Sequence, residues 1–410
     1  MRVLVVSNLF PPVAVGGYER ECAVVVERLR RGHDVLVLCS DLRAGEAPGS
    51  EKQVRRELPF LHHTRRDSLR APLASLGAAR TMRRVLDEHD PELIWIWNGS
   101  GIPQAALRVA QCSGRPVAWR ICQAWFGDLY RVDQFTRHLT PGERGLRGAW
   151  ARAVRVLNRH PALRLDVSRA VPGAISWNSD TLRETTPVPA AVQPVLQRRS
   201  YPATADTARF ATLPRTPLPR PAIAFVGRLT EAKGADLAVR ALALLRDRHE
   251  IRADLVMAGP VEPPMAETLS ALARELDLDG SVQLLGELDG AGVAGLLQGA
   301  HVALVPSREP EGFGLVCAEA AYARVPVVAA RNGAMPEVLR EGAEALFFTI
   351  DDAQGCAEAL AATLGDRPAT AVRVARAFER AQDFSLERYL EESERFVLDA
   401  VAALGGATRR

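Results

Sequence analysis

The stretch HVALVPSREPEGFGLVCAEA, residues 301–320, joins a continuous apolar run to a polar loop and then to a second apolar run. Residues 301–307 are typical of a strand that is buried on both faces, and residues 314–323 favour a helix. The polar segment holds or borders three carboxylates: Glu309, Glu311 and Glu319. Because carboxylates are costly to bury without a partner, their place at the end of a strand indicates a binding site.

Apolar runs of the same kind recur along the whole chain. In the first half they predict strands near residues 3–9, 34–40, 93–97, 116–121 and 174–179. In the second half they predict strands near residues 222–227, 253–259, 282–286, 301–307 and 325–330. Amphipathic segments between these runs favour helices. The alternation predicts an α/β fold with two Rossmann-like, doubly wound parallel-sheet domains that face a central cleft.

A proline-rich segment from about Thr185 to Pro221 separates the two halves. It shows no helical period, so we expect it to contain the linker between two domains. The expected boundaries are residues 1–195 for the first domain, 196–220 for the linker and 221–384 for the second domain.

The composition excludes several classes of protein. The chain has 410 residues, of which 47% are hydrophobic and 25% charged, as in a folded protein with more than one core. No apolar run approaches the roughly 18–20 residues of a membrane span. The six cysteines include no C-x-x-C pair, which favours a reduced, cytoplasmic location and gives no sign of a zinc site.

The formal net charge is +3, but arginines gather in residues 55–84 and 137–169. Each stretch is either a solvated helix face or a surface that attracts phosphorylated ligands or an anionic membrane. Nucleic acid is not an expected partner, because no nucleic-acid motif accompanies the arginines. We expect a cytoplasmic protein, and peripheral contact with the inner membrane face through the basic first domain stays open.

The segment FVGRLTEAKGADL, residues 225–237, places Arg228 and Lys233 in a turn from a strand to a helix, with Gly227 and Gly234 beside them. An arginine can bind phosphate oxygens bidentately and a lysine adds a mobile charge, so the turn suits a dianion. An ordinary surface turn with two basic residues is the alternative. If a helix begins near Gly314, its first amides also favour phosphate.

Residues 222–340 resemble the donor-binding domain of the retaining family-4 glycosyltransferases of GT-B fold. The resemblance rests on the spaced arginine and lysine, on a Glu-x7-Glu pair within EGFGLVCAEA, and on PVVAARNGAMPEVL at residues 326–339. It implies that Glu311 contacts the hydroxyls of the donor sugar and that Glu319 holds the ribose of the nucleotide. It also implies that Arg228 and Lys233 neutralise the leaving diphosphate without a metal or a further cofactor. The remaining donor-side residues would be Gly16, Gly17, Gly227, Leu285, Gly312, Phe313, Gly314, Leu315 and Val316. Glu309 matches no family position and is interpreted as a solvated neighbour.

The first half resembles the family less closely. FPPVAVGGYERE, residues 10–21, is similar to its Gly-Gly loop after the first strand, which implies an acceptor-side role for Glu19. Many relatives carry a histidine where RPVAWRICQAW has Cys122 and Gln123, so we name no catalytic histidine. Either Gln123 replaces its hydrogen bond or the acceptor site is arranged differently. Trp97, Asn98 and Trp125 would border the acceptor, unless the tryptophans lie in the core. The family also implies that a last helix, near residues 385–405, packs back onto the first domain.

The sequence therefore predicts a retaining glycosyltransferase that uses a nucleoside diphosphate sugar. The acceptor would be a carbohydrate, a lipid-linked sugar or a small molecule, in polysaccharide, glycolipid or natural-product biosynthesis. Three alternatives stay open: a donor-binding protein without turnover, a sugar-nucleotide epimerase of the same two-domain shape, and a phosphorylase-like enzyme.

Overall fold

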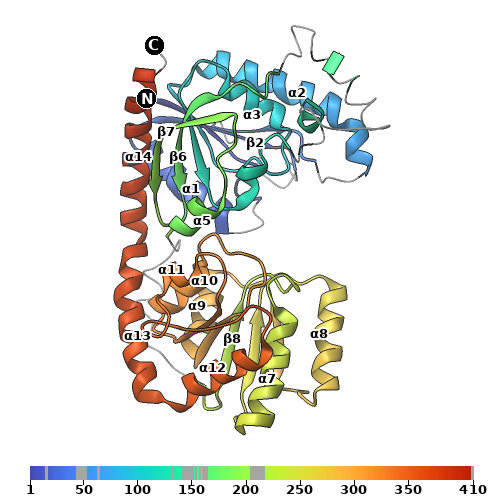
Figure 1. The fold of residues 1–410 in the computed structure, drawn as a ribbon, viewed down its shortest axis with the longest axis vertical. Coiled ribbons are helices and arrows are strands. Elements are labelled where there is room, and N and C mark those ends of the chain that lie inside the picture. The colour runs from blue at the N-terminus through green and yellow to red at the C-terminus, as the bar shows by residue number, and fades with distance from the viewer. Residues whose placement is uncertain are drawn as a thin grey trace. The chain divides into compact units, whose positions relative to one another are not determined.

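The computed structural model describes residues 1–13, 17–42, 53–61, 65–131, 133, 135–139, 152, 155–156, 158, 165–203 and 218–407. The chain divides into two compact units (Figure 1). The unit called here the first domain comprises Met1–Asn178, Leu182–Ser200 and Leu390–Arg410. The second domain comprises Ser179–Thr181 and Tyr201–Tyr389.

The first domain is built on a seven-stranded sheet in the order β3-β2-β1-β4-β5-β6-β7, in which every neighbouring pair is parallel. The strands are β1 (Arg2–Val6), β2 (Asp34–Ser40), β3 (Val54–Leu58), β4 (Leu93–Ile96), β5 (Val117–Ile121), β6 (Val171–Trp177) and β7 (Val192–Arg199). The helices are α1 (Gly17–Arg30), α2 (Arg65–His89), α3 (Gln104–Gln111), the short η2 (Ala124–Asp128) and η3 (Thr136–Leu139), and most of α5 (Asp180–Thr185) and α14 (Leu386–Ala407).

The second domain has a six-stranded parallel sheet in the order β10-β9-β8-β11-β12-β13. Its strands are β8 (Ala222–Val226), β9 (Asp254–Ala258), β10 (Val282–Gly286), β11 (Val302–Val305), β12 (Val327–Ala330) and β13 (Leu346–Phe348). Its helices are α7 (Ala235–His249), α8 (Pro263–Glu275), α9 (Gly290–Gly299), α10 (Leu315–Tyr322), α11 (Met335–Val338), α12 (Ala353–Gly365), α13 (Arg367–Ala381) and η4 (Gln382–Phe384).

Both sheets reverse their strand order at one point, between β1 and β4 and between β8 and β11. Open parallel sheets bind ligands at such a point, beyond the carboxyl ends of the strands. In the second domain the loops after β8 and β11 are residues 227–234 and 306–314, which contain both segments singled out in the sequence.

The predicted fold class of two parallel-sheet α/β domains is confirmed, and each predicted strand is present within a few residues. The expected linker is wrong at its start, because residues 196–199 form the second half of β7. This strand lies at the edge of its sheet and is largely exposed, so it lacks a continuous apolar run and tolerates Pro194. Residues 204–217 of that linker lie outside the described residues, as does most of the arginine-rich stretch 137–169.

The C-terminal helix α14 returns to the first domain from Leu390 onward. Its Phe396 is 1% exposed and packs against Trp95 of β4 at 5.9 Å between ring centroids. Arg28 of α1 also contacts Glu394 at 3.2 Å. The last helix therefore contributes to the core of the first domain. Among the described residues, no helix is long and apolar enough to cross a membrane.

We expect Phe396→Ala to destabilise the first domain by about 3–5 kcal/mol, because it removes a buried aromatic side chain and leaves a cavity. Leu398→Ala is the matched control on the same helix, since Leu398 is 49% exposed. Thermal unfolding followed by tryptophan fluorescence measures both, and equal shifts in Tm for the two variants would contradict the packing described here.

Candidate active site

The turn after β8 lies directly against the loop after β11. Gly234 has a left-handed φ of 73°, and a Cβ there would lie 2.1 Å from the carbonyl oxygen of Pro306. The amides of Arg308 and Glu309 both donate to the carbonyl of Ala232, at 2.9 and 3.0 Å. Only glycine fits this approach, so the backbone alone fixes the distance between the two loops.

The two loops bring opposite charges together. Lys233 Nζ lies 2.8 Å from Glu311 Oε1 and 3.3 Å from Glu309 Oε2. Arg228 Nη2 is 4.0 Å from the same oxygen of Glu309. The Lys233 and Glu311 side chains are about one fifth exposed, whereas those of Arg228 and Glu309 are about half exposed. Glu309 is thus a half-exposed neighbour of both cations, which adds two charged partners to the solvated position expected from the sequence.

Arg308 holds the loop after β11 in place through two ion pairs. Its guanidinium donates to both carboxylate oxygens of Asp236, at 2.6 and 2.9 Å, and to Asp351 at 2.7 Å. Burial disfavours the charged form of Asp236, but these hydrogen bonds hold its pKa below the ordinary value. The sequence analysis missed Arg308, because its partners lie far away in the sequence and only the fold brings them near.

The segment RNGAM after β12 supports Glu311. Gly333 has a φ of 55°, and a Cβ there would lie 2.3 Å from the carbonyl oxygen of Glu311. That oxygen also accepts a hydrogen bond from the amide of Ala334 at 2.8 Å, and Asn332 donates to the carbonyl of Ser307 at 3.0 Å. The motif at residues 326–339 therefore holds the backbone of the loop that carries Glu311.

Helix α10 begins at Leu315, directly after Gly314, whose φ is 91°. Gly314 has no side chain that could cap the helix, so the first amides of α10, including those of Leu315 and Val316, suit an anion. Glu319 is half-buried on this helix. Burial, together with the charges of Glu311 and Glu319, raises the pKa of the Cys317 thiol. Both carboxylates therefore act on one small region.

Phe313 departs from its predicted role in donor binding. It is 3% exposed, and its ring packs against Phe384 at 5.1 Å and Tyr201 at 5.7 Å between centroids. A side chain buried in this way holds the loop in place, so its role is positional. Gly312 contributes its carbonyl, which accepts a hydrogen bond from Ser179 Oγ at 2.8 Å.

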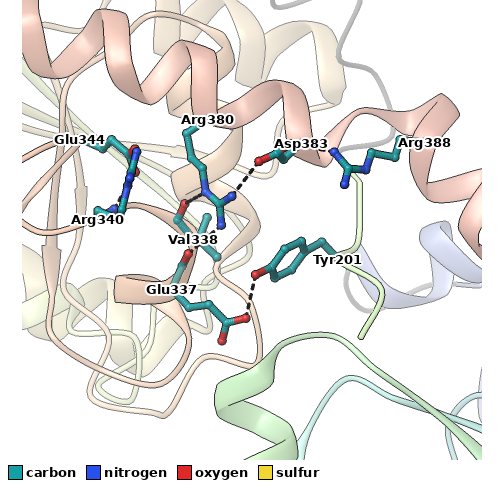
Figure 2. A network of polar contacts seen from close by, with 8 residues as sticks. All are labelled: Tyr201, Glu337, Val338, Arg340, Glu344, Arg380, Asp383 and Arg388. Carbon is teal, nitrogen blue, oxygen red and sulfur yellow. Dashed lines mark hydrogen bonds and ion pairs between the residues drawn. The ribbon is translucent and has the colours of Figure 1, made fainter. Parts of the chain in front are cut away.

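Glu337, in the same motif as Gly333, binds Tyr201 (Figure 2) and the segment Ser179–Thr181, and both belong to the second domain. One carboxylate oxygen accepts from Tyr201 Oη at 2.9 Å and from the amide of Asp180 at 2.8 Å. The other accepts from the amide and the hydroxyl of Thr181, both at 2.8 Å. Arg380 donates to the carbonyl of Glu337 at 3.1 Å. Glu337 therefore helps to hold Tyr201, which packs against Phe313 and Phe384 in one aromatic cluster.

The other donor-side predictions fall at strand ends. Gly227 follows β8 with a φ of 143°, and a Cβ there would have open space. Gly259 follows β9, where a Cβ would lie 1.9 Å from the carbonyl oxygen of Gly227. Leu285 is 46% exposed on the edge strand β10. Gly17 begins α1 in the first domain, and Gly16 lies outside the described residues.

On the first domain, Trp97 corrects the sequence prediction. It is fully buried after β4 and packs against Trp95 at 5.0 Å and Tyr18 at 5.9 Å, so it is a core residue. Asn98 is 7% exposed, and its side-chain oxygen accepts from the amide of Ser100 at 2.9 Å. Glu19 is 5% exposed in the first turn of α1. All three side chains are thus largely withdrawn from solvent.

The segment after β5 has side chains that are accessible to solvent. Gln123 is exposed and Trp125 is half-buried. Cys122 donates to Asn178 Oδ1 at 3.0 Å, and burial raises its pKa well above the ordinary value, so its thiol stays neutral. Gln123 and Trp125 are therefore the predicted acceptor-side residues that remain open to a ligand.

A buried ion pair lies next to this segment and was missed by the sequence analysis. Arg120 Nη2 donates to Glu21 Oε1 at 2.9 Å, and Arg120 also donates to Ser176 Oγ and the carbonyl of Ser200. A buried arginine with several acceptors fixes its neighbours firmly, because losing one partner would leave a costly charge. Among the described residues, no cluster of three or more histidine, cysteine, aspartate or glutamate side chains could hold a metal ion.

Comparison with known proteins finds a family match over the region that contains these loops. Residues 213–380 match the family model described as Glycosyl transferases group 1. The glycogen synthase of Mycobacterium tuberculosis is 29% identical over 396 residues, covering 92% of this chain and 89% of that protein. A D-inositol 3-phosphate glycosyltransferase of Corynebacterium aurimucosum is 34% identical over 189 residues, or 45% of each chain.

Solved glycosyltransferases share the two-domain fold with this chain. Sucrose-phosphate synthase from Thermosynechococcus elongatus has a TM-score of 0.69 at 18% identity and covers 98% of this chain and 99% of its own. HepE from Anabaena, solved in complex with UDP-glucose, has a TM-score of 0.64 at 19% identity and covers 97% and 99%. The GT-B fold of these solved glycosyltransferases is thus the fold of this chain.

We expect Gly234→Ala to destabilise the second domain more than Gly280→Ala, although both glycines have left-handed φ values, 73° and 77°. The reason is that a Cβ at Gly280 meets open space, whereas one at Gly234 meets the Pro306 carbonyl. Backbone strain alone costs of order 1–3 kcal/mol, and the clash adds to it at Gly234. Urea unfolding measures the difference, and an equal loss in both variants would show that the two loops do not approach as described.

Proposed function

We propose that this chain transfers a sugar from a nucleoside diphosphate sugar to an acceptor hydroxyl with retention of configuration. The observation that carries the proposal is the placement of Lys233 beside Glu311, with Arg228 near Glu309, where the strand order reverses. A group 1 glycosyltransferase domain, a dianion-binding turn and a pair of carboxylates for hydroxyl groups together fit one kind of donor.

The cations would stabilise the leaving group. As the bond between the sugar and the diphosphate breaks, negative charge develops on the phosphate oxygens. Arg228, Lys233 and the first amides of α10 are positioned donors for that charge, and such preorganised electrostatics are commonly the largest contribution to catalysis. No metal is needed in this proposal.

The carboxylates would orient the rest of the donor. Glu311 would accept hydrogen bonds from sugar hydroxyls, and Glu319 from the ribose. Leu285, exposed at the edge of the sheet, would contact the base. HepE, which has the same fold, has been solved with UDP-glucose, and a uridine nucleotide is therefore the first donor to test.

The acceptor hydroxyl would attack the anomeric carbon from the face that the diphosphate leaves. The new bond joins the acceptor oxygen to that carbon, and the hydroxyl proton passes to a phosphate oxygen of the leaving diphosphate. This route needs no protein base, which suits a first domain with Cys122 and Gln123 where relatives carry a histidine. Gln123 and Trp125 would contact a carbohydrate, lipid-linked or small-molecule acceptor. We place this reaction in the cytoplasm, with peripheral membrane contact as a further hypothesis.

A donor-binding protein without turnover is the second candidate. The neutral, buried thiol of Cys122 and the burial of Trp97 favour it, because they reduce the polar groups available to an acceptor. Release of the nucleoside diphosphate from radiolabelled sugar donors, with and without a panel of acceptors, separates the two candidates.

We expect Arg228→Ala and Lys233→Ala each to lower kcat by about 10²–10³-fold, as the loss of one charge-stabilising donor does in other enzymes. Arg248→Ala is the control: Arg248 is exposed near the end of α7, which leads to the opposite edge of the sheet. Initial rates of sugar transfer or donor hydrolysis measure the effect. Unchanged rates in the Arg228 and Lys233 variants would contradict the proposed mechanism.

A further inference from the structure

We propose that Glu309 is an internal competitor for the donor diphosphate: its carboxylate occupies the two cations until the diphosphate displaces it. This inference rests on the proposed function and adds a control on donor affinity. Glu309 Oε2 lies 3.3 Å from Lys233 Nζ and 4.0 Å from Arg228 Nη2, so one oxygen faces both cations. A carboxylate in this place stands where a phosphate oxygen would bind.

The backbone of Glu309 is held firmly in this position. Its amide donates to Ala232 at 3.0 Å, and its carbonyl accepts from Ser307 Oγ at 2.9 Å. Pro310 follows, and the residue before a proline is restricted to extended backbone. Arg308, directly before it, is bound to Asp236 and Asp351. The loop therefore presents the Glu309 side chain to the cations and leaves only that side chain free to move.

Glu309 and Glu311 differ in how readily a ligand could displace them. Glu311 is 21% exposed and makes the shorter contact with Lys233, at 2.8 Å. Glu309 is 50% exposed, and its contacts are longer. An exposed ion pair contributes little free energy, because water and salt screen it. Displacement of Glu309 is therefore easy for a dianion, which carries more charge and binds both cations.

The consequence concerns affinity more than chemistry. Because this carboxylate must leave before a diphosphate binds, it weakens the binding of the donor substrate and of the nucleoside diphosphate product to the same extent. Such a uniform effect changes KM and product inhibition while kcat for the chemical step stays the same. The Glu309 carboxylate also keeps Lys233 and Arg228 paired in the free enzyme, and so reduces their attraction for other anions.

The test compares the full-length chain with Glu309→Gln, which keeps the size of the side chain and removes its charge. Calorimetry with UDP, GDP, ADP and inorganic pyrophosphate is run at low and at high salt. We expect Glu309→Gln to bind these diphosphates about two- to fivefold more tightly at low salt, and the difference to shrink at high salt. KM for the donor falls by a similar factor, and kcat does not.

Glu275→Gln is the matched control, since it makes the same charge change at an exposed residue that ends α8. Equal or weaker binding by Glu309→Gln, or an equal gain from Glu275→Gln, overturns the inference. If pyrophosphate binds but no nucleoside diphosphate does, the proposed function fails, and the pyrophosphate comparison still decides the role of Glu309. If no probe binds either protein, both proposals fail.

Discussion

The pairing of β8 with β11 is the contact on which the site depends. Lys233 and Glu311 are 78 residues apart in the sequence, yet their charged atoms lie 2.8 Å apart, because these two strands are neighbours. A parallel arrangement brings both carboxyl ends to the same edge, and open parallel sheets bind ligands where the strand order changes. A different strand order would leave the cations and the carboxylates on separate parts of the surface.

Close backbone approach makes this arrangement rigid. Glycines at 234, 259 and 333 each sit where a Cβ would lie less than 2.5 Å from a backbone oxygen of the neighbouring loop. Around them, Arg308 and Glu337 use charged hydrogen bonds to hold loop and chain segments, and Phe313 packs into an aromatic cluster. Preorganisation of this kind is what electrostatic stabilisation of a leaving group requires, since donors that must reorganise lose much of their effect.

The first domain follows the same topology but uses its strand ends differently. Trp97, Asn98 and Glu19 are buried, and Arg120 forms a buried ion pair with Glu21. Many polar side chains near the carboxyl ends of these strands are thus buried, whereas Gln123 and Trp125 remain accessible. The contrast agrees with the sequence, in which the second half carries the more specific motif.

The sequence by itself determined the two parallel sheets and singled out residues 225–237 and 301–320, because strands buried on both faces appear as continuous apolar runs and the cations and acids keep fixed spacings in the chain. It could not reveal β7, whose exposed edge position removes that signal. The tertiary structure alone decided that Glu309 shares Lys233 with Glu311 and that Phe313 and Trp97 are buried. These outcomes depend on contacts between distant segments, and local spacing does not specify which distant segments will meet.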